Sequence, residues 1–466
     1  MKTEYDVVIL GAGTAGLSAV STLKRAGADF LLIDPGPLGT TCARAGCMPS
    51  KSIIEASSVF HSREIMGEMG IRGSGSLEVD GAGVMNRVRD LRDGFMASSV
   101  RRAEELGDRY LRERARFKEP MVIEAGPHRI SAASVIVATG SSPVVPGPWK
   151  DIGNDLLTSE TVFDLPRLPK SLAVVGLGPL GLEMAQAMAG LGVDVRGYDA
   201  SKTIGGLVDT KVSEEAAAII GREFPIELDS EVRLKACDDG VEVSANGGSR
   251  RFEKVLAAVG RRPRTEDLGL ESLGVEMDEQ GIPLFDAATL KVSGLPVFIA
   301  GDVNGRAPLL HEASDDGRIA GYNAISNRTA SFMRKVRFSI VFTHPCIASV
   351  GWGGQSWEDS GIVVGEASFS GQGRAVMTFR DSGLVRLYVS SGDARLLGAE
   401  MIAPDGEHLA HLAAWAVQRG MTVYDMLRMP FYHPTCEEGL RSAVRDAAHN
   451  CRKGQPAETL PELPLS

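Results

Sequence analysis

The chain has 466 residues, of which 43% are hydrophobic and 24% charged, with a net charge of −10 at pH 7. So long a chain rarely folds around one hydrophobic core, and about three domains are expected. The acidic balance argues against a general nucleic-acid surface, and the most apolar window, residues 172–193, contains Glu183 and Gln186, so no membrane span is predicted. Six cysteines are too sparse for a secreted disulfide scaffold, which favours a cytoplasmic protein.

The first predicted unit binds a dinucleotide. A buried strand at residues 5–10 runs into a helix at 17–26, and a second strand at 29–33 ends at Asp34. Three glycines in the spacing G-x-G-x-x-G join the first strand to the helix: Gly11, Gly13 and Gly16. The glycines permit a tight turn and close approach of a pyrophosphate, the helix N-terminus binds its charge, and the acid binds a ribose.

Two cysteines follow this unit in the stretch GTTCARAGCMPSK at residues 39–51. Positions i and i+5 lie about 140° apart around a helix axis, so Cys42 and Cys47 cannot face each other on a regular helix. Gly46 allows an irregular turn, and Pro49 suits the first position of a following helix. Cys47 would then lie near a helix N-terminus, where the dipole favours the reactive thiolate. Of a structural staple, a metal site and a reactive pair, the local sequence favours redox chemistry.

A second copy of the dinucleotide pattern follows. A strand at residues 172–175 leads through a helix to a strand at 193–198, which ends at Asp199. The glycines are Gly176, Gly178 and Gly181. In both copies the acid follows the first glycine by 23 residues, which makes a chance match improbable.

Two sites imply two dinucleotides, and FAD with a nicotinamide cofactor is the expected pair, because a flavin exchanges hydride with one partner and electron pairs with another. Asp199 favours NAD, since a carboxylate hydrogen-bonds the ribose hydroxyls and repels the 2′-phosphate of NADP. Lys202 lies nearby and softens this preference, so NADP stays the second choice.

Together these features resemble the pyridine nucleotide-disulfide oxidoreductase family over nearly the whole chain, and within it the branch that acts on dihydrolipoamide. Three further stretches carry the resemblance: VATG at 137–140, VFIAGDV at 297–303 and FYHPTCEE at 431–438. The resemblance implies an α/β fold with two Rossmann-like domains and a C-terminal α+β dimerisation domain. The expected divisions are 1–146 and 266–334 for FAD, 147–265 for NAD(P), and 335–466 for dimerisation.

The resemblance also implies the roles of individual residues. Cys42 would exchange with the substrate disulfide, and Cys47 would lie against the flavin as a thiolate. Lys51 would lie near the flavin, paired with Glu183. A lone carboxylate in so apolar a window is costly to bury, which supports this pairing.

His433 resembles the family's acid/base and Glu438 the carboxylate that orients it. A histidine held by a carboxylate can exchange protons with sulfur near neutral pH. In this family the histidine reaches the disulfide of the other subunit, so an obligate homodimer is expected.

The cofactor-binding residues implied by the resemblance form two sets. For FAD they are Gly11, Gly13, Gly16, Asp34, Thr41, Lys51, Thr139, Gly140, Gly301, Asp302, Leu309, Leu310, His311 and Ala313. For NAD they are Gly176, Gly178, Gly181, Asp199 and Gly260. Asp302 would contact the ribityl chain. No metal site is expected, because His408 and His411 have no visible third ligand and are assigned to a helix face.

The expected activity is reversible oxidation of protein-bound dihydrolipoamide by NAD⁺, with a lipoyl-carrier protein or a small disulfide as partner. Mercuric reductases share the first half but carry a vicinal C-terminal cysteine pair, whereas Cys436 and Cys451 are not adjacent. Arg44 departs from the family's usual linker between the cysteines. It could lower a thiol pKa, attract an anionic disulfide or point to solvent. A reductase of another small disulfide is the alternative activity, and a flavoprotein module without catalysis is the alternative class.

Overall fold

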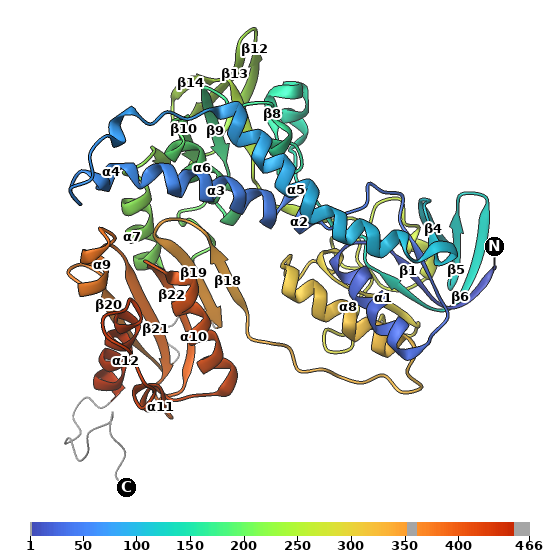
Figure 1. Cartoon of the computed structure of the whole chain (residues 1–466). Helices are drawn as coiled ribbons and strands as arrows, with labels where there is room; N and C mark the ends of the chain where they lie inside the picture. The colour runs from blue at the N-terminus through green and yellow to red at the C-terminus, as the bar shows by residue number, and fades with distance from the viewer. Residues whose placement is uncertain (1, 352–360, 452–466) are drawn as a thin grey trace.

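The first dinucleotide unit folds as a mixed sheet at the end of the molecule where the N-terminus lies (Figure 1), parallel except at β4 (Ala115–Glu119) and β5 (Val122–Ala125), which pair antiparallel. The computed structural model describes residues 2–351 and 361–451. Strand β1 (Glu4–Leu10) lies between β2 (Phe30–Ile33) and β6 (His128–Val137), and the remaining strands of this sheet are β3 (Tyr110–Leu111) and β17 (Val297–Ile299). β1 and β2 are almost continuously apolar because both faces of the sheet are covered.

Two helices cover one face of this sheet and pack closely on each other (Figure 1). They are α1 (Thr14–Ala26) and α8 (Leu310–Ala324). Glycine permits this approach, since a Cβ added to Gly317 would lie 2.1 Å from the carbonyl oxygen of Ala15. The contact brings the first phosphate-binding helix beside a segment some 300 residues later in the chain.

The second dinucleotide unit forms a separate parallel sheet in the order β11-β10-β9-β15-β8. Its strands are β8 (Leu156–Leu157), β9 (Ser171–Val175), β10 (Asp194–Tyr198), β11 (Ile226–Glu227) and β15 (Lys254–Ala257), with helices α6 (Pro179–Gly190) and α7 (Thr210–Ile220). A three-stranded antiparallel sheet stands above it: β12 (Arg233–Cys237), β13 (Gly240–Ala245) and β14 (Gly248–Phe252). The ribbon β7 (Ser141–Pro143) and β16 (Arg261–Pro263) pairs the chain leaving the first unit with the chain returning to it.

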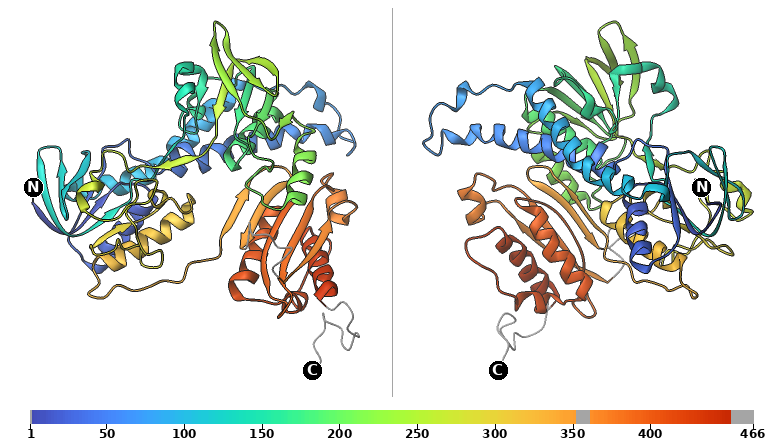
Figure 2. Two further views of the ribbon diagram at one scale, coloured as in Figure 1. Left: turned by 180° about the vertical axis from the view of Figure 1, so that it is seen from behind. Right: turned by 45° about the vertical axis from the view of Figure 1, so that its right-hand side comes forward.

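The C-terminal part is an antiparallel sheet in the order β18-β19-β22-β21-β20, covered by helices. Its strands are β18 (Phe338–Val341), β19 (Cys346–Gly351), β20 (Ile362–Ser368), β21 (Leu384–Ser390) and β22 (Leu396–Ala403). Its helices are α9 (Gly373–Met377), α10 (Gly406–Arg419), α11 (Val423–Leu427) and α12 (Glu437–Cys451). In both views of Figure 2 an extended linker, residues 325–337, connects α8 to this part.

The helices that carry and follow the cysteines lead from the first sheet to the second unit, where α3 (Cys47–His61) packs on α6 (Figure 1). The others are α2 (Thr41–Ala45), α4 (Arg63–Met66) and α5 (Gly81–Glu104). Ile53 of α3 is fully buried in a core that also contains Leu182 of α6 and Ile347 of β19. The helix that begins at Cys47 therefore packs against both the second unit and the C-terminal sheet.

A buried polar cluster fixes the second unit on the C-terminal sheet. Glu400 is 1% exposed and accepts hydrogen bonds from the backbone N–H groups of Val208 and Asp209, at 3.1 and 2.8 Å. The Asp209 carboxylate in turn accepts hydrogen bonds from Arg386 and from the hydroxyl of Tyr388. Because the carboxylates of Glu400 and Asp209 both accept hydrogen bonds, the free-energy cost of burying their charges at this interface is offset.

The dinucleotide units follow the sequence prediction closely, and the main difference lies in the cysteine segment. The helix begins at Cys47, two residues before the predicted start at Pro49. The first four N–H groups of a helix lack intrahelical partners, so proline fits anywhere in this turn. Among the described residues, no helix is both long and apolar enough to cross a membrane.

The close contact between α1 and α8 predicts that one added methyl group destabilises the fold. Gly317→Ala is expected to lower the free energy of unfolding by about 1–3 kcal/mol, because the added Cβ meets backbone and forces the helices apart. Gly94→Ala is the control, since nothing lies within 4 Å of its Cβ position in α5 and alanine favours a helix. Thermal unfolding followed by circular dichroism measures both. Equal melting temperatures for the two variants would contradict the close packing.

Candidate active site

A cavity of about 500 Å³ lies where the three parts of the chain meet. Its walls come from the N-terminus of α1, the cysteine segment, the N-terminus of α6, the start of α8 and strand β18. The residues expected from the sequence that line it are Gly13, Thr41, Cys42, Cys47, Lys51, Gly140, Glu183, Gly301, Asp302, Leu309, Leu310, His311 and Ala313. Segments separated by up to about 400 residues in the sequence therefore form one site.

The two cysteines lie on different helices that meet at a break. Cys42 belongs to the short helix α2, whose N-cap Thr40 accepts a hydrogen bond from the backbone N–H of Ala43. At Gly46 the backbone leaves helical geometry (φ −141°, ψ −119°), and α3 begins with Cys47. A Cβ on Gly46 would lie 3.1 Å from the carbonyl oxygen of Thr41, so a larger residue would crowd this turn. The irregular turn at Gly46 thus brings together two cysteines that a regular helix would place on different faces.

The two thiols differ in acidity. The cysteines are in the reduced form, with Cys47 exposed to the cavity and Cys42 half-buried. A hydrogen bond from the Cys42 thiol, together with the charge of Lys51, lowers the pKa of Cys47 to about 7 despite the opposing effect of burial. The same hydrogen bond, burial and the charge of Cys47 strongly raise the pKa of Cys42. Cys47 is therefore the thiolate of the pair near neutral pH.

Glu183 joins all three parts of the chain beside the cysteines. Its carboxylate is 4% exposed, and both oxygens lie 2.8 Å from Nζ of Lys51. One of these oxygens also accepts the backbone N–H of Phe342 at 3.0 Å, and the ammonium lies 4.4 Å from the Phe342 ring centroid. This arrangement satisfies a buried carboxylate with a charge from α3 and a donor from the C-terminal part.

The first glycine turn has the geometry of a pyrophosphate cradle. A Cβ on Gly11 would lie 2.4 Å from the carbonyl oxygen of Ala138, and one on Gly16 would lie 1.9 Å from the carbonyl oxygen of Gly11. In contrast, nothing lies within 4 Å of a Cβ on Gly13, which lines the cavity before α1. The side chain at the end of β2, Asp34, accepts the N–H of Ala12 at 2.7 Å, so its carboxylate borders this turn. These residues fit FAD: an open N-terminus for the phosphates and an acid for the ribose.

The second turn repeats this geometry. A Cβ added to Gly176 would lie 2.4 Å from a backbone carbonyl oxygen, and one added to Gly181 would lie 1.9 Å from another. Nothing lies within 4 Å of a Cβ added to Gly178. Asp199 accepts the N–H of Leu177 at 2.5 Å, as Asp34 does in the first turn. Lys202 points toward Asp229, at 3.8 Å, and is highly exposed. The second turn therefore fits an adenosine ribose that carries free hydroxyls.

Arg261 is a site residue that the sequence analysis did not identify. Its side chain lines the cavity and donates hydrogen bonds to Ser141 and Ser159, while the Ser141 hydroxyl donates to Asp302 at 2.8 Å. Burial lowers the pKa of Arg261, against the opposing charge of Asp302. No signal in the sequence separated Arg261 from its neighbour Arg262, which pairs at the surface with Glu266.

Arg44 pairs with a carboxylate of the second unit. Its guanidinium faces Glu160 at 3.7 Å, and Glu160 also pairs with Arg264 at 2.9 Å. The cation that lowers the pKa of Cys47 is Lys51. Arg44 therefore ties the helix that carries Cys42 to the second unit.

His433 and Glu438 form a pair on the C-terminal part, outside the cavity of their own chain. Nδ1 of His433 lies 3.0 Å from a Glu438 oxygen, and the imidazole is 79% exposed. This hydrogen bond lowers the pKa of Glu438. The carboxylate also accepts the backbone N–H of Thr435 at 3.2 Å, which fixes its orientation.

The two histidines of α10 have different surroundings. His411 lines the cavity and packs edge-on against Phe338, with ring centroids 4.8 Å apart. The sequence analysis assigned His411 only to a helix face. His408 is exposed on the same helix. Within residues 2–351 and 361–451, no group of three or more histidine, cysteine, aspartate or glutamate side chains could hold a metal ion.

Thr139 of the expected FAD set and Gly260 of the expected NAD set do not line the cavity. The hydroxyl of Thr139 donates to the carbonyl oxygen of Arg264. Gly260 directly precedes strand β16, which pairs with β7, and its carbonyl oxygen accepts the N–H of Val144.

Known proteins resemble this chain in sequence, and solved structures resemble it in fold. The chain is 33% identical to a dihydrolipoyl dehydrogenase of Thermus scotoductus, over 96% of this chain and 98% of that protein. It is 28% identical to a mercuric reductase of Staphylococcus aureus, over 95% and 82%. Among solved structures, the HOCl-induced flavoprotein disulfide reductase RclA of Escherichia coli superposes with a TM-score of 0.84 at 22% identity, covering 95% of this chain and 99% of that one.

Family models cover most of the chain. Residues 5–317 match the model described as pyridine nucleotide-disulphide oxidoreductase, and residues 338–444 match the dimerisation domain of the same family. The fold predicted from the sequence, two Rossmann-like units followed by a dimerisation domain, is confirmed. With two glycine turns of the same geometry, a cysteine pair beside the cavity and these matches, the chain belongs to the pyridine nucleotide-disulphide oxidoreductase family.

Proposed function

We propose that the protein oxidises protein-bound dihydrolipoamide with NAD⁺, using FAD and a reversible Cys42–Cys47 disulfide. The observation that supports this most directly is the acidic thiol of Cys47, which faces a cavity bordered by the first glycine turn and by Asp302. The net reaction is dithiol + NAD⁺ → disulfide + NADH + H⁺. A homodimer with a shared active site would be the working unit.

The residues of this chain supply thiol exchange and proton transfer. A substrate thiolate attacks Cys42 of the disulfide, a mixed disulfide forms, and Cys47 leaves as the thiolate that its low pKa favours. The second substrate thiol, deprotonated by His433 of the partner subunit, displaces Cys42 and completes the product disulfide. Bound FAD supplies the means of passing the electron pair from the dithiol of Cys42 and Cys47 to NAD⁺.

The other residues position these groups. Lys51 and Glu183 hold α3 against α6, so that the thiolate and the lysine charge stay together. The carboxylate of Asp199 favours NAD⁺ over NADP⁺ by binding ribose hydroxyls.

Reduction of another small disulfide is the second candidate. Arg44 motivates it, because the residue adds a cation between the two cysteines, and relatives include both dihydrolipoyl dehydrogenases and a mercuric reductase. The ion pair of Arg44 with Glu160 favours a structural role and therefore the lipoamide activity.

The substrate class is tested by titrating the purified protein with NADH without oxygen while recording the flavin spectrum, then adding lipoamide or, separately, glutathione disulfide. Long-wavelength absorbance that appears with NADH and disappears with lipoamide is expected, because the reduced Cys47 thiolate interacts with the flavin until a disulfide reoxidises it. Absorbance that only glutathione disulfide removes would favour the second candidate. A protein that carries no flavin would contradict both.

The charges beside Cys47 predict opposite shifts of its pKa. The thiolate of Cys47 is present above about pH 7 and lost as the pH falls below this value. Lys51→Met is expected to raise this pKa because the favourable cation is removed, whereas Glu183→Gln is expected to lower it because Glu183 opposes the thiolate. The rate of iodoacetamide reaction with the reduced protein, measured from pH 5 to 10, reports each pKa. Shifts in the same direction for both variants would contradict the electrostatic assignment.

A shared active site predicts complementation between two inactive variants. Cys42→Ser and His433→Ala homodimers are each expected to lack dithiol oxidation. After the two are dissociated together and reassembled, about half of the dimers are mixed, and each mixed dimer has one site with an intact Cys42 and an intact His433. About a quarter of wild-type activity should return. No recovery, with mixed dimers verified by mass spectrometry, would place the whole site within one chain.

A further inference from the structure

The wall of the cavity formed by Gly301, Asp302 and the start of α8 is held by one buried carboxylate. The Asp316 side chain is 3% exposed, and its Oδ2 accepts the N–H of Gly301 at 2.9 Å and the side-chain amide of Asn304 at 2.7 Å. Gly301 and Asn304 flank the turn that presents Asp302 to the cavity. The direction of the Asp302 side chain therefore depends on where Asp316 lies.

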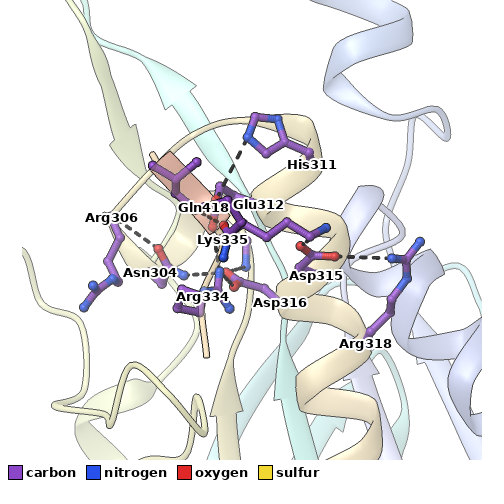
Figure 3. A network of polar contacts seen from close by, with 12 residues as sticks. Asn304, Arg306, His311, Glu312, Asp315, Asp316, Arg318, Arg334, Lys335 and Gln418 are labelled. Atoms are coloured by element: carbon purple, nitrogen blue, oxygen red, sulfur yellow. Dashed lines mark hydrogen bonds and ion pairs between the residues drawn. The ribbon is translucent and has the colours of Figure 1, made fainter. Parts of the chain in front are cut away.

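The second oxygen of Asp316 meets a charge from the interdomain linker (Figure 3). The Arg334 Nη2 atom donates to Asp316 Oδ1 and, at 2.7 Å, to Glu312 Oε2. Glu312 and Asp316 are four residues apart on α8, so their carboxylates lie on one face of the helix and repel each other unless a cation bridges them. Burial raises the pKa of Asp316, and the Gly301 N–H and the Arg334 charge oppose this rise.

The linker is fixed at its other end to the C-terminal part. Two residues after Arg334, the N–H of Val336 donates to the side-chain carbonyl of Gln418 on α10, at 2.8 Å. The linker then enters β18, where Phe338 lines the opposite side of the cavity and stacks on His411 of α10. One short stretch thus touches both walls of the site.

We propose that Arg334 is a positioning residue for the flavin: acting through Asp316, it fixes the Asp302 turn and the start of α8 against the wall that the C-terminal part supplies. This inference rests on the proposed FAD-dependent function and assigns to it a residue outside the cavity. Without the guanidinium, Glu312 and Asp316 lose their shared cation, and the turn at 301–304 loses its fixed acceptor.

The neighbouring linker residue provides a matched control. Lys335 pairs with Asp315 at 2.7 Å, so the linker residue after Arg334 contacts the helix residue before Asp316 through the same kind of ion pair. Lys335 is 63% exposed, and its partner is shared with Arg318 at the surface rather than with the Gly301 turn. Loss of this pair removes a linker charge without touching the cavity wall.

The test compares FAD-loaded Arg334→Ala and Lys335→Ala with the wild-type protein. Arg334→Ala is expected to weaken FAD binding about tenfold and to change the visible circular dichroism of the bound flavin, because the groups around it move. Lys335→Ala is expected to keep both within about twofold. Arg334→Lys should lie between Arg334→Ala and the wild type, because an ammonium keeps the charge but not the fork geometry. If Arg334→Ala does not fold, the Arg334→Lys protein gives the decisive comparison with Lys335→Ala.

A double-mutant cycle tests whether the effect passes through Asp316. In the Asp316→Asn background, Arg334→Ala is expected to change FAD affinity by less than about twofold, since its route to the turn is already broken. Independent, multiplicative effects would overturn the proposal, as would an unchanged flavin spectrum accompanied only by a lower melting temperature. Both measurements follow FAD binding and the flavin spectrum, not catalysis. A protein that binds FAD but oxidises no dithiol would therefore contradict the proposed function, while the role of Arg334 could still be measured.

Discussion

The buried carboxylate of Glu183 is the constraint on which the site depends. A carboxylate that is 4% exposed is stable only if opposite charge and donors replace the water it lost. Lys51 provides the charge from the helix that starts at Cys47, and Phe342 provides an N–H from the C-terminal part. The three parts of the chain must therefore come together at this residue, and the cavity forms where they meet.

The same ion pair sets the chemistry of the cysteines. It holds the Lys51 ammonium close enough to Cys47 to favour its thiolate, while Glu183 moderates that effect. The break at Gly46 places Cys42 where its thiol can donate a hydrogen bond to Cys47. This hydrogen bond lowers the pKa of Cys47 and raises the pKa of Cys42. An asymmetric pair of this kind suits an exchange in which one sulfur meets substrate and the other holds the negative charge.

Charged groups that lie outside the cavity organise it in a similar way. Arg44 links the Cys42 helix to the second unit through Glu160, and Arg334 links the interdomain linker to α8 through Asp316 and Glu312. The Asp209 and Glu400 cluster fixes the second unit on the C-terminal sheet. In each case a buried or half-buried ion pair crosses a boundary between parts, where apolar packing alone would allow them to slide.

The sequence by itself determined the two dinucleotide units and the place of the cysteine pair directly after the first of them. Their signals are local: glycine spacing, strand and helix periodicity, and an acid at a fixed offset depend on neighbouring residues and on backbone sterics. Only the tertiary structure decided that Arg44 faces Glu160, that Arg261 and His411 border the cavity, and that Arg334 reaches Asp316. A surface arginine and a buried one have the same local sequence signature. Their partners lie many residues away in the chain, and only packing of the three parts brings the charges within reach of each other.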